Sequence, residues 1–200
     1  LCIVDNKLYV ANSGGYRAPN YDNTLSEIDL TTFKEIRKIK VGLNLHHCQV
    51  DHYGQIWVTS RGNYNDVPSR IYWLYKGHNQ LYEVIDSIDT PVSGLSIVGD
   101  SLYYYGSAWN SATATNTISY GLINVRTHQT IETNLFSAPQ IKDVTMPYGI
   151  MVNPTERDFY LMDAKNYVSS GSLLHFKPDG TFDWSVQTGD IPGHATFVYK

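Results

Sequence analysis

The sequence has few cysteines, no long hydrophobic run and no block of positive charge. Its two cysteines, Cys2 and Cys48, are too few to form a disulfide-stapled scaffold, and we expect them to be unpaired core residues of neighbouring repeats. No stretch has the length and apolar character of a membrane span, and none has the pattern of a signal peptide. A formal net charge of -4 without a large basic cluster argues against a nucleic-acid partner, whose phosphates attract clustered Lys and Arg.

Sustained helical periodicity is also missing, whereas tyrosine is abundant. The chain has 16 Tyr against 6 Phe, an excess that suits half-exposed strands and binding surfaces, because the ring packs while its hydroxyl meets water. The one basic run, KEIRKIK at 34–40, alternates charged and apolar residues. It predicts an exposed outer strand whose lysines discourage edge pairing, rather than a phosphate site.

A repeat runs through the whole sequence. Aromatic segments recur at intervals of 46 to 57 residues, as KLYVANS (7–13), QIWVTSR (55–61), SLYYYGS (101–107) and DFYLMDA (158–164). Each follows a short apolar strand and precedes a polar loop and two more strands. Four strands per unit without a helix predict an all-β fold, a β-propeller of four-stranded antiparallel blades. The predicted blades span approximately 1–43, 44–91, 92–147 and 148–191.

The last segment, 192–200, has the pattern of an innermost strand with no strands after it. PGHATFV aligns with PYGIMV and LHHCQV, which begin two of the repeats. Propellers commonly close when a strand from one terminus completes a blade begun at the other. Because the first repeat already has an inner strand in LCIV, we expect three partner strands before Leu1, so that the chain supplies the C-terminal four blades plus one closing strand of a larger ring. The alternative is a four-bladed ring with a disordered or swapped end strand.

The first repeat, LYVANSGG...NTLSEIDLTTFKEIRKIKVG, resembles the YVTN (YncE-like) propeller repeat in its Y-V-x-N, S-x-I-D and I-x-x-I-x-V-G motifs. The second, IWVTSRGN...SRIYWL, is a fair match, and the others match in strand layout. The whole chain is similar to the surface layer propeller lipoproteins of Bacteroidetes. That resemblance implies a seven-bladed ring, lipid-anchored at the cell surface or outer membrane through a preceding segment. As in some members, it implies capture of a corrinoid, cobalamin, and its transfer to an outer-membrane transporter.

The loops that join the second to the third strand of each repeat are long and rich in Tyr, Asn, Gly and Arg. In a four-stranded blade they emerge on the same face as the segments that lead into the inner strands. Loops on a rigid scaffold carry binding groups, with donors from Asn and Arg and flat contact area from Tyr and Trp. The alternative is that Asn and Gly only form turns. Ligand contact is expected from Tyr16, Arg17, Arg61, Asn63, Tyr64, Trp109, Asn110, Asn166 and Tyr167.

The segments that lead into the inner strands add a second group of candidates: His46, His47, Tyr148 and His194. Because side chains alternate along a strand, His46 and His47 should point in opposite directions, one packing between blades and the other facing the channel. Histidines near an axis can bind a metal, but no short spacing such as HxH occurs. We therefore expect hydrogen bonding to a ligand, with no metal and no cofactor.

The remaining ionisable residues are assigned structural roles. Asp29 and Asp51 look like strand-end caps or acceptors between blades, and His175 lies in a third strand. The carboxylates near the loop face, Asp22, Asp66 and Asp163, form no evident pair for general acid/base work.

These features predict a non-catalytic ligand-capture propeller. No GxSxG, HExxH or phosphate-binding glycine loop is present, so no motif indicates an enzyme. Two alternatives stay open. One is an enzyme resembling the propeller lyases, with His46, His47 or His194 as general base and a carboxylate-bound Mg²⁺. The other is a protein-docking or glycan-binding scaffold.

Overall fold

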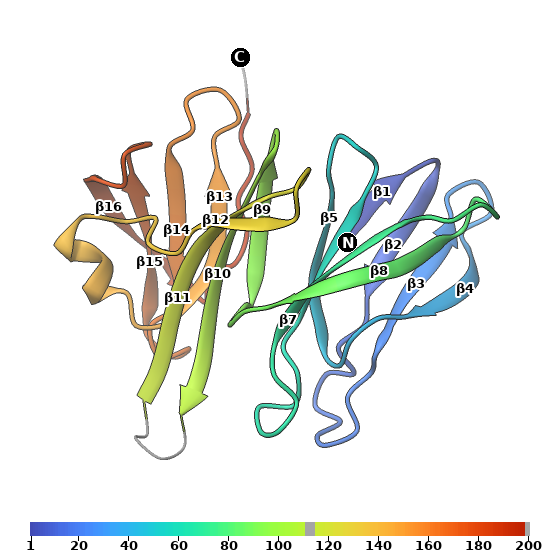
Figure 1. Cartoon of the computed structure of the whole chain (residues 1–200). Coiled ribbons are helices and arrows are strands. Elements are labelled where there is room, and N and C mark those ends of the chain that lie inside the picture. The colour runs from blue at the N-terminus through green and yellow to red at the C-terminus, as the bar shows by residue number, and fades with distance from the viewer. Residues whose placement is uncertain (111–114, 199–200) are drawn as a thin grey trace. The chain divides into compact units, whose positions relative to one another are not determined.

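The computed structural model describes residues 1–110 and 115–198, with side chains for 1–107 and 117–198. The described residues form four four-stranded antiparallel sheets, and the strands of each sheet lie in chain order (Figure 1). The predicted all-β fold of four-stranded antiparallel units is therefore confirmed. The part of the chain that the structure describes has no helix long and apolar enough to cross a membrane.

The chain divides into two compact units, Leu1–Ser93 and Gly94–Lys200. The first unit contains two sheets, with strands β1 (Cys2–Val4), β2 (Lys7–Ala11), β3 (Thr24–Asp29), β4 (Lys34–Lys40), β5 (Leu45–Val50), β6 (Ile56–Ser60), β7 (Arg70–Lys76) and β8 (Tyr82–Asp89). The second unit contains β9 (Gly94–Val98), β10 (Ser101–Asn110), β11 (Thr115–Asn124), β12 (Gln129–Glu132), β13 (Pro147–Val152), β14 (Phe159–Asp163), β15 (Ser170–Phe176) and β16 (Phe182–Asp190).

The core of the first unit lies between its two sheets. Alternate residues of β2 and β3, such as Tyr9 and Leu25, point towards Ile56 and Val58 of β6, and all four are almost fully buried. Both cysteines lie in this core and are free, as predicted. The Sγ atom of Cys48 lies 3.5 Å from the carbonyl oxygen of Tyr9. This contact links β5 of the second sheet to β2 of the first.

A buried carboxylate stabilises the outer half of the first sheet. Glu27 of β3 has a side chain only 1% exposed and accepts hydrogen bonds of 2.6 Å from Lys7 Nζ and from Arg37 Nε. Burial disfavours the charged carboxylate, but the hydrogen bonds and charges of Lys7 and Arg37 outweigh it and hold the pKa of Glu27 below its usual value. Arg37 also donates to the carbonyl oxygen of Tyr82 at 3.1 Å, linking the first sheet to the second.

This ion triad should make the protein sensitive to acid. Because the folded-state pKa of Glu27 is depressed, the stabilisation is fully present above the unfolded pKa near 4.5 and is lost as pH falls through the lower folded-state value. We expect the difference in free energy of unfolding between the wild type and Glu27→Gln to shrink as pH is lowered from about 6 to about 3, measured by urea denaturation. A difference that stays constant over this range would contradict the assignment.

The core of the second unit is aromatic. Phe136, which lies just before the 3-10 helix η1 (Pro139–Asp143), packs against Phe159 at 5.3 Å and Phe176 at 4.6 Å between ring centroids. Tyr103 of β10 meets Phe159 edge-on at 5.4 Å. These rings fill the space between the sheet β9–β12 and the sheet β13–β16, with the connection that contains η1 along one side.

The opposite face of the sheet β13–β16 carries a polar cluster. His175 of β15 lies between two carboxylates, with Nε2 at 2.5 Å from Asp158 and Nδ1 at 3.0 Å from Asp183. The indole ring of Trp184 stacks on the imidazole with the centroids 5.0 Å apart, and the hydroxyl of Tyr160 donates to Asp158 at 3.2 Å. His175 therefore lies in the third strand of its sheet, as the sequence predicts, with a carboxylate at each ring nitrogen.

The tail after β16 is not a strand in the structure. Residues 192–198 have no assigned strand, although Phe197 packs on Tyr160 with 5.4 Å between ring centroids. An extended segment becomes a β-strand only where a neighbouring backbone pairs with it. The partners expected for this segment would lie before Leu1, so the closing strand and the larger ring stay predictions.

Candidate functional site

Two of the predicted ligand-contact residues, Asn63 and Asn166, form side-chain hydrogen bonds within their own loops. The Oδ1 atom of Asn63 accepts from the backbone N–H groups of Asn65 (3.0 Å) and Val67 (2.9 Å), which closes the β6–β7 loop. Asn166 does the same in the β14–β15 loop, accepting from Val168 and Ser169 at 3.0 and 2.8 Å. The amide oxygens of Asn63 and Asn166 thus stabilise the turns of these loops, and ligand contact by either residue stays a prediction.

Arg61 and Asn44 contact each other where the β6–β7 loop meets the segment that leads into β5. The backbone N–H of Arg61 donates to the carbonyl oxygen of Asn44 at 3.1 Å, and its Nη2 lies 3.4 Å from Asn44 Oδ1. The N–H of Asn44 donates in turn to the carbonyl oxygen of Asp22 at 2.8 Å. Residues from three separate segments are therefore fixed together by main-chain hydrogen bonds.

Two buried hydrogen-bond donors of this pair have no partner among the described residues. They are Asn44 Nδ2 and Arg61 Nε, and Asn44 is only 1% exposed. Buried donors are normally satisfied, because leaving one unpaired costs about 1–3 kcal/mol. An acceptor group such as a carboxylate, a phosphate or an amide oxygen is the chemical partner that such N–H groups require, and one of the two is cationic.

Asn44 was missed by the sequence analysis. It precedes β5, has φ +60° and lies between two leucines in GLNLHH. Asparagine tolerates this left-handed backbone conformation better than most residues, so the position looked like an ordinary turn. The only signal in the sequence is a polar residue flanked by leucines, one of which, Leu45, is fully buried.

Aromatic residues occur in the same loops as Arg61 and Asp22. Tyr64, which is 55% exposed, meets Tyr21 edge-on with 6.1 Å between ring centroids. Tyr21 was not predicted to contribute. Tyr16 and Arg17 lie further out in the β2–β3 loop, and both are exposed. The structure brings Arg61 and Tyr64 into one loop but gives Tyr16 and Arg17 no described side-chain contact with them.

The regular strand pairing on which the predicted directions of His46 and His47 depend is interrupted. The pairing of β5 with β6 runs from Leu45 opposite Ser60 to Cys48 opposite Val58, so β5 contains a bulge at the two histidines. In a bulge two residues oppose one, and the simple alternation of side chains fails. His46 Nδ1 lies 2.8 Å from the carbonyl oxygen of Ser93, and the N–H of His47 donates to Thr59 Oγ1 at 3.0 Å. Both histidines are half-buried.

The second unit has its own group of predicted contact residues, in β13, the β14–β15 loop and the tail. Tyr148 of β13 and Tyr167 of the β14–β15 loop meet edge-on, with 5.6 Å between ring centroids. Tyr167 is 44% exposed, and the exposed His194 follows Gly193, which packs near the Tyr148 ring. The structure therefore joins two of the predicted residues, Tyr148 and Tyr167, into one aromatic pair.

The predicted β10–β11 loop is shorter than expected. The strands continue to Asn110 and resume at Thr115, which face each other across the pair, so most of the polar segment 107–117 is strand. Its alternating threonines favour a pleated strand over an open loop. Trp109 and Asn110 therefore lie in β10, and their side chains fall outside the described residues.

Solved structures similar to the chain include several propellers. Hydrazine synthase from Kuenenia stuttgartiensis is 16% identical with a TM-score of 0.64, covering 88% of this chain and 49% of that chain. A structural genomics protein of unknown function from Bacteroides thetaiotaomicron is 13% identical with a TM-score of 0.58, covering 90% and 41%. A luciferin-regenerating enzyme is 14% identical with a TM-score of 0.55, covering 95% and 66%.

The chain has a β-propeller fold. Each four-stranded antiparallel sheet is one blade, and at such low identities the likeness shows the fold alone. The chain spans between 41% and 66% of the length of these three structures. No family model and no curated protein matches the sequence. In the part of the propeller that the structure describes, no group of three or more His, Cys, Asp or Glu side chains could hold a metal ion.

Proposed function

We propose that the chain is part of a non-catalytic propeller that captures a polar ligand at the loop ends of its blades. The observation that carries this proposal is the pair of buried, unpartnered donors, Asn44 Nδ2 and Arg61 Nε. A ligand acceptor placed against them would satisfy both, which removes an energetic cost of the free protein and adds a charge-assisted hydrogen bond.

A corrinoid is the ligand that we propose for this site. Its periphery carries amide oxygens and a phosphate, which are acceptors of the kind that Arg61 and Asn44 require. The exposed Tyr64, next to Tyr21, offers a ring surface for the apolar parts of a large molecule. By the same resemblance to surface layer propellers, we propose that the whole protein is lipid-anchored at the cell surface and delivers the ligand to an outer-membrane transporter.

The test mixes the protein with cyanocobalamin and follows visible absorbance and protein together through a size-exclusion column. We expect the red chromophore to travel with the protein and the ligand to raise the melting temperature, because binding to the native state stabilises it by mass action. Arg61→Gln should weaken binding by about 10- to 100-fold, the equivalent of one lost hydrogen bond from a charged donor.

Arg126→Gln is the matched control. Arg126 is an exposed residue of the β11–β12 turn, and its replacement by glutamine removes the same positive charge. Its affinity for cyanocobalamin should equal that of the wild type. Elution of all the colour with free ligand would rule out corrinoid capture by this chain. Equal losses in Arg61→Gln and Arg126→Gln would show that general charge, rather than the buried donor, holds the ligand.

A further inference from the structure

The second unit contains a cavity separate from the Asn44–Arg61 site. Its volume is about 260 Å³, and it lies between η1 and the core-facing side of the sheet β13–β16. The pairing registers place Asp163 opposite Ser172 and Leu174 opposite Ser185, so these four lining residues share one face of that sheet. Sites for drug-sized ligands are about 300–1,000 Å³, so this volume suits a smaller molecule.

The lining combines donors and acceptors around an apolar floor. Gln140 and Asp143 come from η1, Lys165 comes from the β14–β15 loop, and Leu174 and Phe182 provide the floor. Carboxylates accept, an ammonium donates, and amide and serine groups do both. A neutral molecule with many hydroxyl groups can satisfy such a mixed set, whereas a simple anion or cation would meet charges of its own sign.

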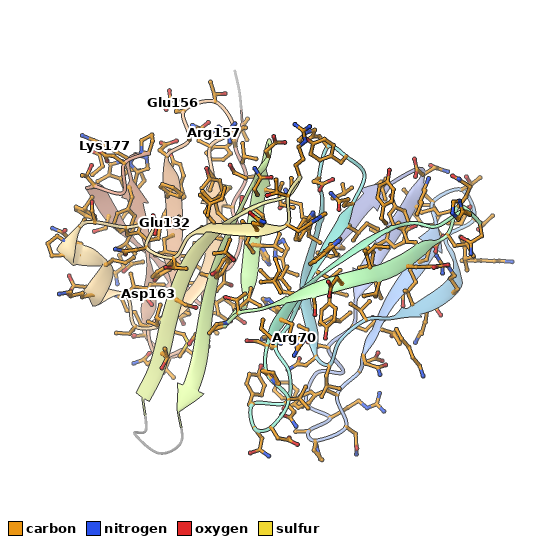
Figure 2. The ribbon with its side chains drawn as sticks, viewed as in Figure 1. Arg70, Glu132, Glu156, Arg157, Asp163 and Lys177 are labelled. Atoms are coloured by element: carbon orange, nitrogen blue, oxygen red, sulfur yellow. The ribbon has the colours of Figure 1, made fainter. Side chains whose placement is uncertain are left out.

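Asp163 is one of the residues that line this cavity and is only 3% exposed. Its position is labelled in Figure 2. Oδ1 accepts from the N–H groups of Met146 (2.8 Å) and Lys165 (3.0 Å), while Oδ2 has one long contact of 3.4 Å to the N–H of Thr145. A carboxylate oxygen normally accepts more than one good hydrogen bond, so Oδ2 retains capacity for a further donor.

Tyr120 of β11 does not line the cavity, but it is the residue of this unit whose pKa the charge of Asp163 affects. Its hydroxyl is buried and has no hydrogen-bond partner among the described residues. Burial, together with the charge of Asp163, raises the pKa of this hydroxyl, so it stays protonated and able to donate. A buried tyrosine hydroxyl usually finds a partner.

We propose that this cavity binds a single hexopyranose ring, either as a free sugar or as the terminal residue of a glycan. Asp163 Oδ2 and Asp143 would accept from sugar hydroxyls, and Lys165 and Gln140 would donate to them. The apolar C–H face of the ring would lie on Phe182. The site is independent of the proposed corrinoid site, which lies in the other unit.

Saturation-transfer NMR on the full chain tests this proposal, with D-glucose, D-galactose, D-mannose and their methyl glycosides as probes. We expect ring-proton signals for at least one hexose. Binding of both the free sugar and its methyl glycoside would identify the terminal residue of a glycan, because the methyl group stands where the chain continues. Binding of the free sugar alone would identify a free monosaccharide.

Two tryptophan variants on the same strand locate the binding. Ser185→Trp should fill the cavity and reduce the signal about tenfold or more, whereas Val186→Trp should leave it unchanged. Val186 is the next residue of β16, is 51% exposed and points to the opposite face. A signal that survives Ser185→Trp, or no signal with any of the six probes, would overturn the proposal. Circular dichroism of both variants checks that each retains the fold.

Discussion

Replacement of Asp51 by alanine should lower the free energy of unfolding by about 3–5 kcal/mol, one of the largest effects of any single substitution in this chain. Asp51 is only 6% exposed and accepts four hydrogen bonds at the turn between β5 and β6. Oδ1 accepts from the N–H groups of Tyr53 and Gln55, both at 2.9 Å. Oδ2 accepts from Gln55 Nε2 at 3.1 Å and from the indole N–H of Trp57 at 2.8 Å.

The size of this effect follows from what alanine leaves behind. The indole N–H of Trp57, a residue with no exposed surface, would lose its 2.8 Å acceptor in a buried site, and the turn would lose two main-chain anchors. Urea denaturation monitored by tryptophan fluorescence measures the loss. Asp29→Ala is the matched control, because Asp29 caps a turn in the same way through the N–H groups of Thr31 and Thr32 but is exposed to water that can replace it. A loss no larger than that of Asp29→Ala would contradict the role given to Asp51.

Replacement of His175 by phenylalanine should cost about 2–4 kcal/mol, although the new ring fits the same space. In the wild type the imidazole Nε2 lies 2.5 Å from Oδ2 of Asp158. The Asp158 side chain is 8% exposed, and its Oδ1 has no partner among the described residues. Phenylalanine would leave this buried carboxylate with the hydroxyl of Tyr160 as its one described side-chain donor. Removing one member of a buried pair is costly because the other charge stays in a site that water reaches poorly.

A double-mutant cycle separates this cost from any change in packing. If the unpaired carboxylate of Asp158 causes the loss of stability, the double variant Asp158→Leu/His175→Phe should be more stable than His175→Phe alone. The coupling energy between the two substitutions should exceed about 1 kcal/mol. His78→Phe, at an exposed turn position, should change stability by no more than about 0.5 kcal/mol. Additive effects of Asp158→Leu and His175→Phe would mean that the ring, and not the ion pair, matters at this position.

The repeat in the sequence was sufficient to predict the four sheets and most strand positions, because each strand has its own alternation of buried and exposed residues. The cap at Asp51 and the free cysteines also followed from residue type and spacing. The candidate site was harder to predict. The bulge at His46 and His47 breaks the alternation on which the prediction of their directions depended. Asn44 looked like a turn residue, and only the three-dimensional structure shows its amide buried beside Arg61.

The way in which Asn44 and Arg61 are held also determines the kinetics expected for a bound ligand. Their main-chain hydrogen bonds to each other and to Asp22 fix the backbone before any ligand arrives, and the contact of Arg61 Nη2 with Asn44 Oδ1 orients the two side chains. A preorganised site loses little conformational entropy on association and requires no slow rearrangement of the loop. Ligand association should therefore be governed by diffusion and orientation, and substitutions at Arg61 should act mainly by shortening the residence time of the complex.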